Sequence, residues 1–325
     1  MSFKEIVGQD HIVNFLLSSF KADRLSGAYV FVGKEGTGRA KLAKEFAKLV
    51  NCQDAKDEPC DICESCRKID SEQHPDIHWF RPEKNSITID QVRELEKYVY
   101  LKPYEAEKKF FIICDAQRLE EESSNALLKT LEEPTKNSVI ILLVNDLSAL
   151  LPTISSRFQK VIFNALDEKA IKDILIQKYK IPLLQAHFIS YLAEGSPGRA
   201  MEFKDLREDL FEKRSHILNS VYFKKFSLLR MEEFSVKDGT QMRKGVSLLL
   251  DILLSWFRDL LVVRTGLDLP LINMDKKEDL VKLNAQYTPE ELARNIAIVA
   301  NTRSLVNANI NVKIALSKMR ADLWR

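Results

Sequence analysis

A chain of 325 residues with 45% hydrophobic content is long enough for two or three domains with separate cores. Its 49 lysines and arginines nearly balance 47 acidic residues, so net charge excludes a strongly basic nucleic-acid-binding protein and leaves only local patches for such contacts. The first ten residues carry charges where a secretory signal would need an apolar segment. We therefore expect a cytoplasmic protein.

The longest apolar run, residues 245–263, reads GVSLLLDILLSWFRDLLVV. Asp251, Arg258 and Asp259 interrupt it, so it is too polar for a membrane span. We expect a buried amphipathic helix there and no membrane partner.

The first half of the chain alternates strand and helix patterns, which predicts an α/β fold with a mainly parallel sheet. Residues 28–32 form a short apolar run that predicts a strand, and residues 39–50 repeat apolar positions with a helical period. Between them, FVGKEGTGRA (31–40) follows the spacing of a phosphate-binding loop. A loop in this context presents backbone N–H groups and a helix N-terminus to phosphate.

This loop departs from an ATPase loop at its end. Gly33, Gly36, Thr37 and Gly38 supply the glycine-rich part, but Arg39 replaces the lysine and Ala40 replaces the hydroxyl residue. The lysine contacts the β- and γ-phosphates and the hydroxyl binds Mg²⁺, and an arginine is not an equivalent of that lysine. We expect a vestigial loop in which ATP or ADP binding is doubtful.

Two more strands are predicted at 108–117 and 138–146, with a helix between them at about 123–133. Ser123 or Ser124 is the expected N-cap of that helix, and Pro134 lies just past its end. Asp115 stands where an ATPase would hold Mg²⁺, but Ala116 follows it where a second acid would usually support a metal ligand. A carboxylate in a turn at the strand end is therefore the simpler interpretation.

Cys52, Cys60, Cys63 and Cys66 lie close together in the sequence and predict a structural Zn²⁺ site. Disulfides are disfavoured in the cytosol, and an iron–sulfur cluster would need a further spaced cysteine followed by proline. The segment around these cysteines is acidic, which argues against a nucleic-acid-binding finger.

Several motifs together resemble the bacterial clamp-loader subunits of the AAA+ class. They are the degenerate loop, the four-cysteine insert after its helix, HPD (74–76), NALLKTLEEP (125–134) and SSRF (155–158). The resemblance covers about the first 200 residues well and the remainder in length and helical character. It implies an AAA+ P-loop-type sheet domain at 1–165 with the zinc module at 52–66, a small helical lid at 166–205 and an all-α collar for oligomerisation at 206–325.

The resemblance also implies roles for individual residues. Ser156 and Arg157 match a Ser-Arg-Cys motif whose arginine acts as a finger in the ATP site of the neighbouring subunit, with Phe158 in place of the cysteine. Asn145 and Arg199 fall at the first and second sensor positions of the class. Without the resemblance, Arg157 would be read as a surface arginine and Asn145 as a polar strand end.

Two functions remain open from these features. The first is a non-hydrolysing clamp-loader subunit, part of the DNA polymerase III holoenzyme in DNA replication. It would complete a hetero-pentamer with tau/gamma and delta subunits and reach the sliding clamp and primer-template DNA through that complex. The second is an active ATPase of the tau/gamma kind. Arg39 and Ala40 favour the first, so we expect no catalysis by the chain itself.

Overall fold

The computed structural model describes residues 3, 6–54, 58–83, 86–132, 135–222, 239–308 and 310–323. The chain forms two compact units, one of Met1–Asp167 with Gly195–Arg199 and one of Glu168–Glu194 with Ala200–Arg325. Pro134, expected just beyond a helix, lies outside the described residues.

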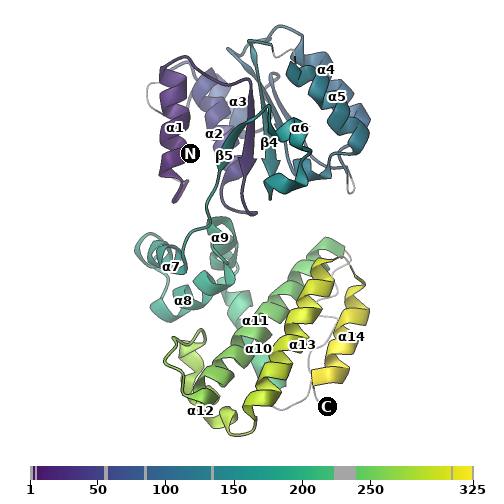
Figure 1. The fold of residues 1–325 in the computed structure, drawn as a ribbon. Coiled ribbons are helices and arrows are strands. Elements are labelled where there is room, and N and C mark those ends of the chain that lie inside the picture. The colour runs from purple at the N-terminus through teal and green to yellow at the C-terminus, as the bar shows by residue number, and fades with distance from the viewer. Residues whose placement is uncertain are drawn as a thin grey trace. The chain divides into compact units, whose positions relative to one another are not determined.

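The first unit is built on a five-stranded parallel sheet (Figure 1). Its strands lie in the order β2-β3-β4-β1-β5. All four pairings are parallel, and β1 lies between β4 and β5. The strands are β1 (Ala28–Val32), β2 (Ile77–Phe80), β3 (Lys109–Ile113), β4 (Ser138–Val144) and β5 (Gln159–Ile162). The expected α/β class with a parallel sheet is confirmed.

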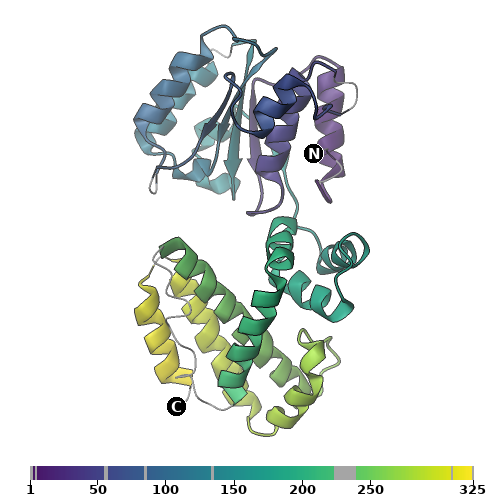
Figure 2. The same cartoon turned by 180° about the vertical axis from the view of Figure 1, so that it is seen from behind.

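Helices cover both faces of this sheet, so its central strands are apolar on both sides (Figures 1 and 2). Phe31 and Phe110 pack with the helices of one face, and Val30 and Phe111 pack with those of the other. The first face carries α1 (Asp10–Lys21), α2 (Arg39–Asn51) and α3 (Glu64–Asp70); the second carries α4 (Ile89–Val99), α5 (Glu121–Glu132) and α6 (Pro152–Ser155). Two short 3₁₀ helices, η2 (Ala116–Arg118) and η3 (Leu147–Ala149), follow β3 and β4.

One helix start differs from the expectation. Helix α5 begins at Glu121, so Ser123 and Ser124 lie inside it and neither is its N-cap. The Ser123 hydroxyl is buried and donates instead to the carbonyl of Ile87, at 3.0 Å. The hydroxyl that the sequence pattern assigned to capping therefore makes a hydrogen bond to a distant part of the chain.

The second unit is helical throughout its described part. It contains α7 (Glu168–Gln177), α8 (Leu183–Leu192), α10 (Arg207–Tyr222), α11 (Gly239–Thr265), η6 (Met274–Lys276), α12 (Lys277–Asn284), α13 (Pro289–Asn307) and α14 (Val312–Leu323), while α9 (Pro197–Asp205) begins in the first unit. Helix α13 begins with a capping box between Thr288 and Glu291. None of the helices in the described ranges is long and apolar enough to cross a membrane.

Within this unit, the helices of the expected lid pack against the expected collar. The Arg214 guanidinium lies 4.0 Å from the ring centroid of Phe188 in α8. His187 Nε2 lies 2.8 Å from the carbonyl oxygen of Leu271. The division into 1–165, 166–205 and 206–325 stays a proposal, because these contacts join its second and third parts.

Candidate functional sites

The glycine-rich loop connects the carboxyl end of β1 to the start of α2. Gly36 (φ +76°) and Gly38 (φ +100°) adopt left-handed backbone conformations, which glycine accepts without strain. Gly38 is the N-cap of α2, so the helix begins at Arg39. The Gly33 amide donates to the carbonyl of Val144 at the end of β4 (3.1 Å). The strand, loop and helix therefore have the arrangement of a phosphate-binding loop.

The side chains of Thr37 and Arg39 point into the protein interior. Arg39 is only 8% exposed, and its Nη2 donates to Asn145 Oδ1 at 2.8 Å. Thr37 is buried and donates its hydroxyl to the carbonyl of Lys34, also at 2.8 Å. Ala40, on the surface, has no hydroxyl with which to bind Mg²⁺.

The first turn of α9, with Ser196 just before it, packs directly on the loop. The Gly198 amide donates to the Gly36 carbonyl at 2.8 Å. A Cβ added at Gly36 would lie 2.2 Å from Ser196 Oγ, so the two backbones are too close for a side chain there. Ser196 Oγ in turn accepts from the Arg199 amide at 3.2 Å. The structure thus brings Arg199, the residue expected at the second sensor position, beside the loop.

Asp115 follows β3 at the same edge of the sheet as the loop. Its backbone is left-handed (φ +50°), its carbonyl accepts from the Arg118 amide, and its Oδ1 accepts from Gln117 Nε2 at 3.1 Å. These contacts are those of a carboxylate in a turn, the simpler of the two sequence interpretations.

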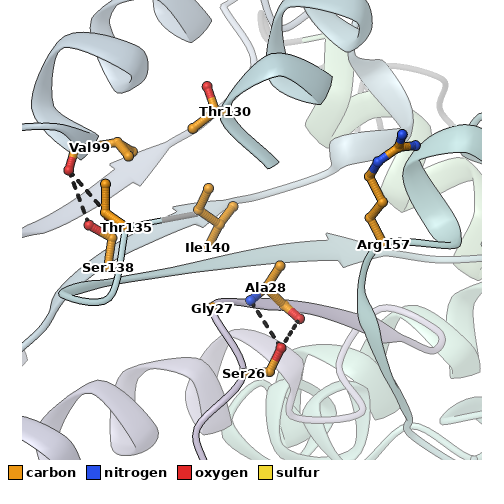
Figure 3. Close-up of a pocket in the computed structure, with 9 residues that line it drawn as sticks. All are labelled: Ser26, Gly27, Ala28, Val99, Thr130, Thr135, Ser138, Ile140 and Arg157. Carbon is orange, nitrogen blue, oxygen red and sulfur yellow. Dashed lines mark hydrogen bonds between the residues drawn. The ribbon is translucent and has the colours of Figure 1, made fainter. Parts of the chain in front are cut away.

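Arg157 lies at the opposite edge of the sheet, where the parallel strands begin. It precedes β5, and it lines a pocket together with residues at the start of β1 (Figure 3). The lining also includes Ser26, Gly27, Ala28, Val99, Thr130, Thr135, Ser138 and Ile140. Arg157 is exposed, and its Nη1 donates to the Thr153 carbonyl at 2.7 Å. Because the loop follows the other end of β1, a strand of five residues, or roughly 16 Å, separates the two features.

The residues on either side of Arg157 fix its backbone. Its amide donates to the Ile154 carbonyl at 3.0 Å, and the exposed Ser156 donates its hydroxyl to the Thr153 carbonyl at 3.2 Å. Phe158, which replaces the cysteine of the resemblance, is 5% exposed and belongs to the core under α4 and α5. Phe158 therefore fixes this segment to the core, while the neighbouring Arg157 lies on the surface.

The four cysteines converge as expected. Their Sγ atoms all lie within 4.8 Å of one another. A tetrahedral ion with Zn–S bonds of 2.3 Å would place sulfurs about 3.8 Å apart, so the cluster can hold a metal ion. Cys52 ends α2 and Cys63 caps α3, so such an ion would join these two helices.

Backbone amides point at the sulfurs of this cluster. The amides of Cys60, Cys63 and Cys66 donate to the sulfurs of Cys52, Cys60 and Cys63, respectively, at 3.3–3.4 Å. The amides of Ile62 and Cys63 lower the pKa of the Cys60 thiol to about 7, whereas burial raises the pKa of Cys66. Amide donors favour thiolates, the form that binds metal.

A buried lysine in α2 forms ion pairs next to the cysteine cluster. Lys48 in α2 has a fully buried side chain, and its Nζ pairs with Asp61, with Asp70 (3.1 Å) and with Glu45 (3.4 Å). Burial alone would lower the pKa of Lys48, but its hydrogen bonds to Asp61 and Asp70 outweigh that effect and raise it. No sequence pattern had singled out this lysine, because its partners become apparent only when α2 and α3 pack together.

Two family models match separate parts of the chain. Residues 8–167 match the family model described as DNA polymerase III, delta subunit, and residues 208–321 match that of its C-terminal part. The chain is 32% identical to DNA polymerase III subunit delta′ of Bacillus subtilis, over 94% of this chain and 93% of that protein. It is 28% identical to the tau subunit of the same organism, over 91% of this chain but only 57% of that protein. A solved gamma-subunit-related protein of Thermotoga maritima is 20% identical with a TM-score of 0.41, over 95% of this chain and 97% of that one.

Proposed function

We propose a function from one premise, that the chain belongs to the DNA polymerase III delta′ family of bacterial clamp-loader subunits. In this proposal it completes a clamp-loader ring without hydrolysing ATP and presents Arg157 to the ATP site of the neighbouring subunit. The ring is a hetero-pentamer with tau/gamma and delta subunits, located in the cytoplasm, and the chain reaches the sliding clamp and primer-template DNA through it.

The observation that carries this proposal is the position of Arg157 relative to the loop of its own subunit. The two lie at opposite edges of the sheet, separated by the whole length of β1. An arginine side chain cannot bridge roughly 16 Å. If Arg157 meets the γ-phosphate of a nucleotide, that nucleotide must be bound by another subunit.

The state of the loop supports the non-hydrolysing role over the tau-like alternative. The lysine that would reach the phosphates is replaced by Arg39, whose guanidinium bonds to Asn145. The hydroxyl that would hold Mg²⁺ is replaced by the methyl group of Ala40, and Asp115 is engaged in a turn. An active ATPase needs all three of these functions at one site.

We assign Zn²⁺ to the cysteine cluster and give it a structural role. Four cysteine ligands fill a tetrahedral coordination sphere, so no position remains for a reacting water. The cluster would hold the end of α2, the helix that begins at the loop, against α3.

The test is reconstitution with the partner subunits. Arg157→Ala should leave assembly intact, because an exposed arginine contributes little to folding. It should lower DNA-stimulated ATPase and clamp loading, since a finger arginine is worth roughly 10³–10⁵ in rate at its own site in GTPases. Because the ring has several ATP sites, total turnover should fall by less than this factor. Arg157→Lys should not restore activity, because an ammonium lacks the forked donor geometry.

Arg24→Ala is the matched control. Arg24 is also an exposed arginine, and it precedes β1 at the edge of the sheet where the strands begin. The control should retain normal ATPase and clamp loading. Equal losses in both variants, or normal clamp loading by Arg157→Ala, would refute the assignment of the finger.

A further inference from the structure

Arg39 is an unusual residue to find inside a vestigial loop. It is the first residue of α2, only 8% of it is exposed, and arginine is seldom buried without a partner. Its partner, Asn145, is 106 positions away in the sequence and follows β4. The contact therefore ties the start of α2 to the end of a different strand.

The charge of this guanidinium is retained despite burial. Burial lowers the pKa of Arg39, while the nearby carboxylates of Asp115 and Glu35 act in the opposite direction. Arginine stays protonated in proteins because its ordinary pKa lies far above neutral pH. A fixed positive charge thus lies among the polar groups at the carboxyl ends of β3 and β4.

In an active P-loop ATPase, bound cations and phosphates fill this region. The lysine and Mg²⁺ neutralise the phosphates, and the polar strand ends contact the nucleotide and its metal. Here the side chain that replaces the lysine donates a direct hydrogen bond of 2.8 Å to the residue at the strand end, Asn145.

We propose that Arg39 is a built-in cation that links the glycine loop to the end of β4 in place of a bound nucleotide, so that the loop keeps one arrangement with or without nucleotide. This inference rests on the proposed non-hydrolysing function and gives it a structural cause. The sheet that positions the finger arginine for the neighbouring subunit would then keep the same geometry whether or not this subunit binds a nucleotide.

A second contact holds the loop from another side. Gly198 donates its amide to the Gly36 carbonyl at 2.8 Å, and a Cβ on Gly198 would lie 2.8 Å from Gly36 Cα. The loop is consequently joined to the end of β4 through Arg39 and to the start of α9 through its backbone.

The test is amide hydrogen exchange of the purified full-length chain, measured by mass spectrometry. Arg39→Met removes the charge and Asn145→Ala removes the acceptor, and each should speed exchange of residues 33–42 by roughly fivefold to thirtyfold. The double variant should be little faster than either single one, because the two residues share one interaction. Arg81→Met is the matched control, since Arg81 follows β2 at the same edge but is more than half exposed and should leave loop exchange unchanged.

Nucleotide provides the second arm of the experiment. Among the described residues, Arg39 Nη1 has no hydrogen-bond partner, so the competing role for this guanidinium is to hold a ligand phosphate. Millimolar Mg·ADP or Mg·ATP should not slow exchange of residues 33–42 in the wild-type chain. Protection by either nucleotide, unchanged exchange in Arg39→Met, or fully additive effects in the double variant would each overturn the inference.

These outcomes are independent of the finger. The exchange experiment needs no partner subunit, whereas the role of Arg157 is read from the ATPase of the assembled ring. A failure of the Arg39 link would leave the proposed finger standing, and a failure of the finger would not alter the loop exchange.

Discussion

Phe158→Ala should destabilise the sheet unit, because this side chain fixes the segment that carries Arg157. Phe158 is 5% exposed and packs in the core that α4 and α5 form against the sheet. Removing its ring leaves a cavity at the point where the chain enters β5. Two consequences follow, a lower free energy of unfolding and a loss of the fixed backbone beneath the neighbouring arginine.

The magnitude follows from the burial of the ring. Substitution of a buried phenylalanine by alanine costs about 3–5 kcal/mol. Every 1.4 kcal/mol corresponds to a factor of about ten. Amides of β1 and β4 that exchange only through unfolding of the unit should therefore exchange at least about a hundredfold faster. Phe158→Cys, which restores the residue of the Ser-Arg-Cys motif, should cost less because it leaves a smaller cavity.

Hydrogen exchange of the strand amides measures this effect for the sheet unit separately from the helical unit. Ile162→Ala is the matched control, because Ile162 lies in β5 but is 59% exposed. It should change strand exchange by far less. If Phe158→Ala cost no more than Ile162→Ala, Phe158 would not be the anchor of this segment.

Three further predictions concern the metal, the loop and one buried carboxylate. Elemental analysis should find about one zinc ion per chain, and Cys66→Ser should reduce it; iron instead of zinc would contradict the assignment. The isolated chain should show no ATPase above background in a phosphate-release assay, because Arg39 and Ala40 supply neither the lysine nor the metal ligand; robust turnover would favour the tau-like alternative. Asp76 accepts the amides of Tyr104, Glu105 and Ala106 at 2.8–2.9 Å, and although burial raises its pKa, these bonds lower it overall. Asp76→Asn should therefore cost about 2 kcal/mol in urea denaturation at pH 7. Because the folded pKa is depressed, the advantage of the aspartate should be complete above its ordinary pKa of about 3.9 and disappear as the pH falls through the folded value; a difference that persists at lower pH would contradict this account.

The sequence was informative where the signal was local. The strand at 28–32 and the helix from Arg39 each depend on residues within a few positions of one another, and both are present in the structure. Strand β2 (Ile77–Phe80) was not predicted, because its four residues include a histidine and have no clear period. Contacts between distant segments, such as Arg39 with Asn145 or Gly36 with Gly198, have no local pattern at all.

The position of Arg157 is an intermediate case. The sequence supplied the residue through the resemblance, and the connection from β4 to a parallel β5 requires the chain to return to the amino edge before residue 159. The placement of the loop and Arg157 at opposite edges of the sheet can therefore be deduced once β1 and β5 are known to be parallel neighbours. What no pattern supplied was that Phe158, which stands in place of the cysteine, is buried in the core.

The central claim is that Arg157 acts on a nucleotide held by another subunit. The most direct measurement is the burst of phosphate release, counted as ATP hydrolysed per assembled complex on addition of clamp and primer-template DNA. Our account predicts that complexes with Arg157→Ala lose the equivalent of one ATP from this burst, while complexes with Arg24→Ala keep the full amplitude. An unchanged burst in Arg157→Ala complexes that assemble normally would contradict it.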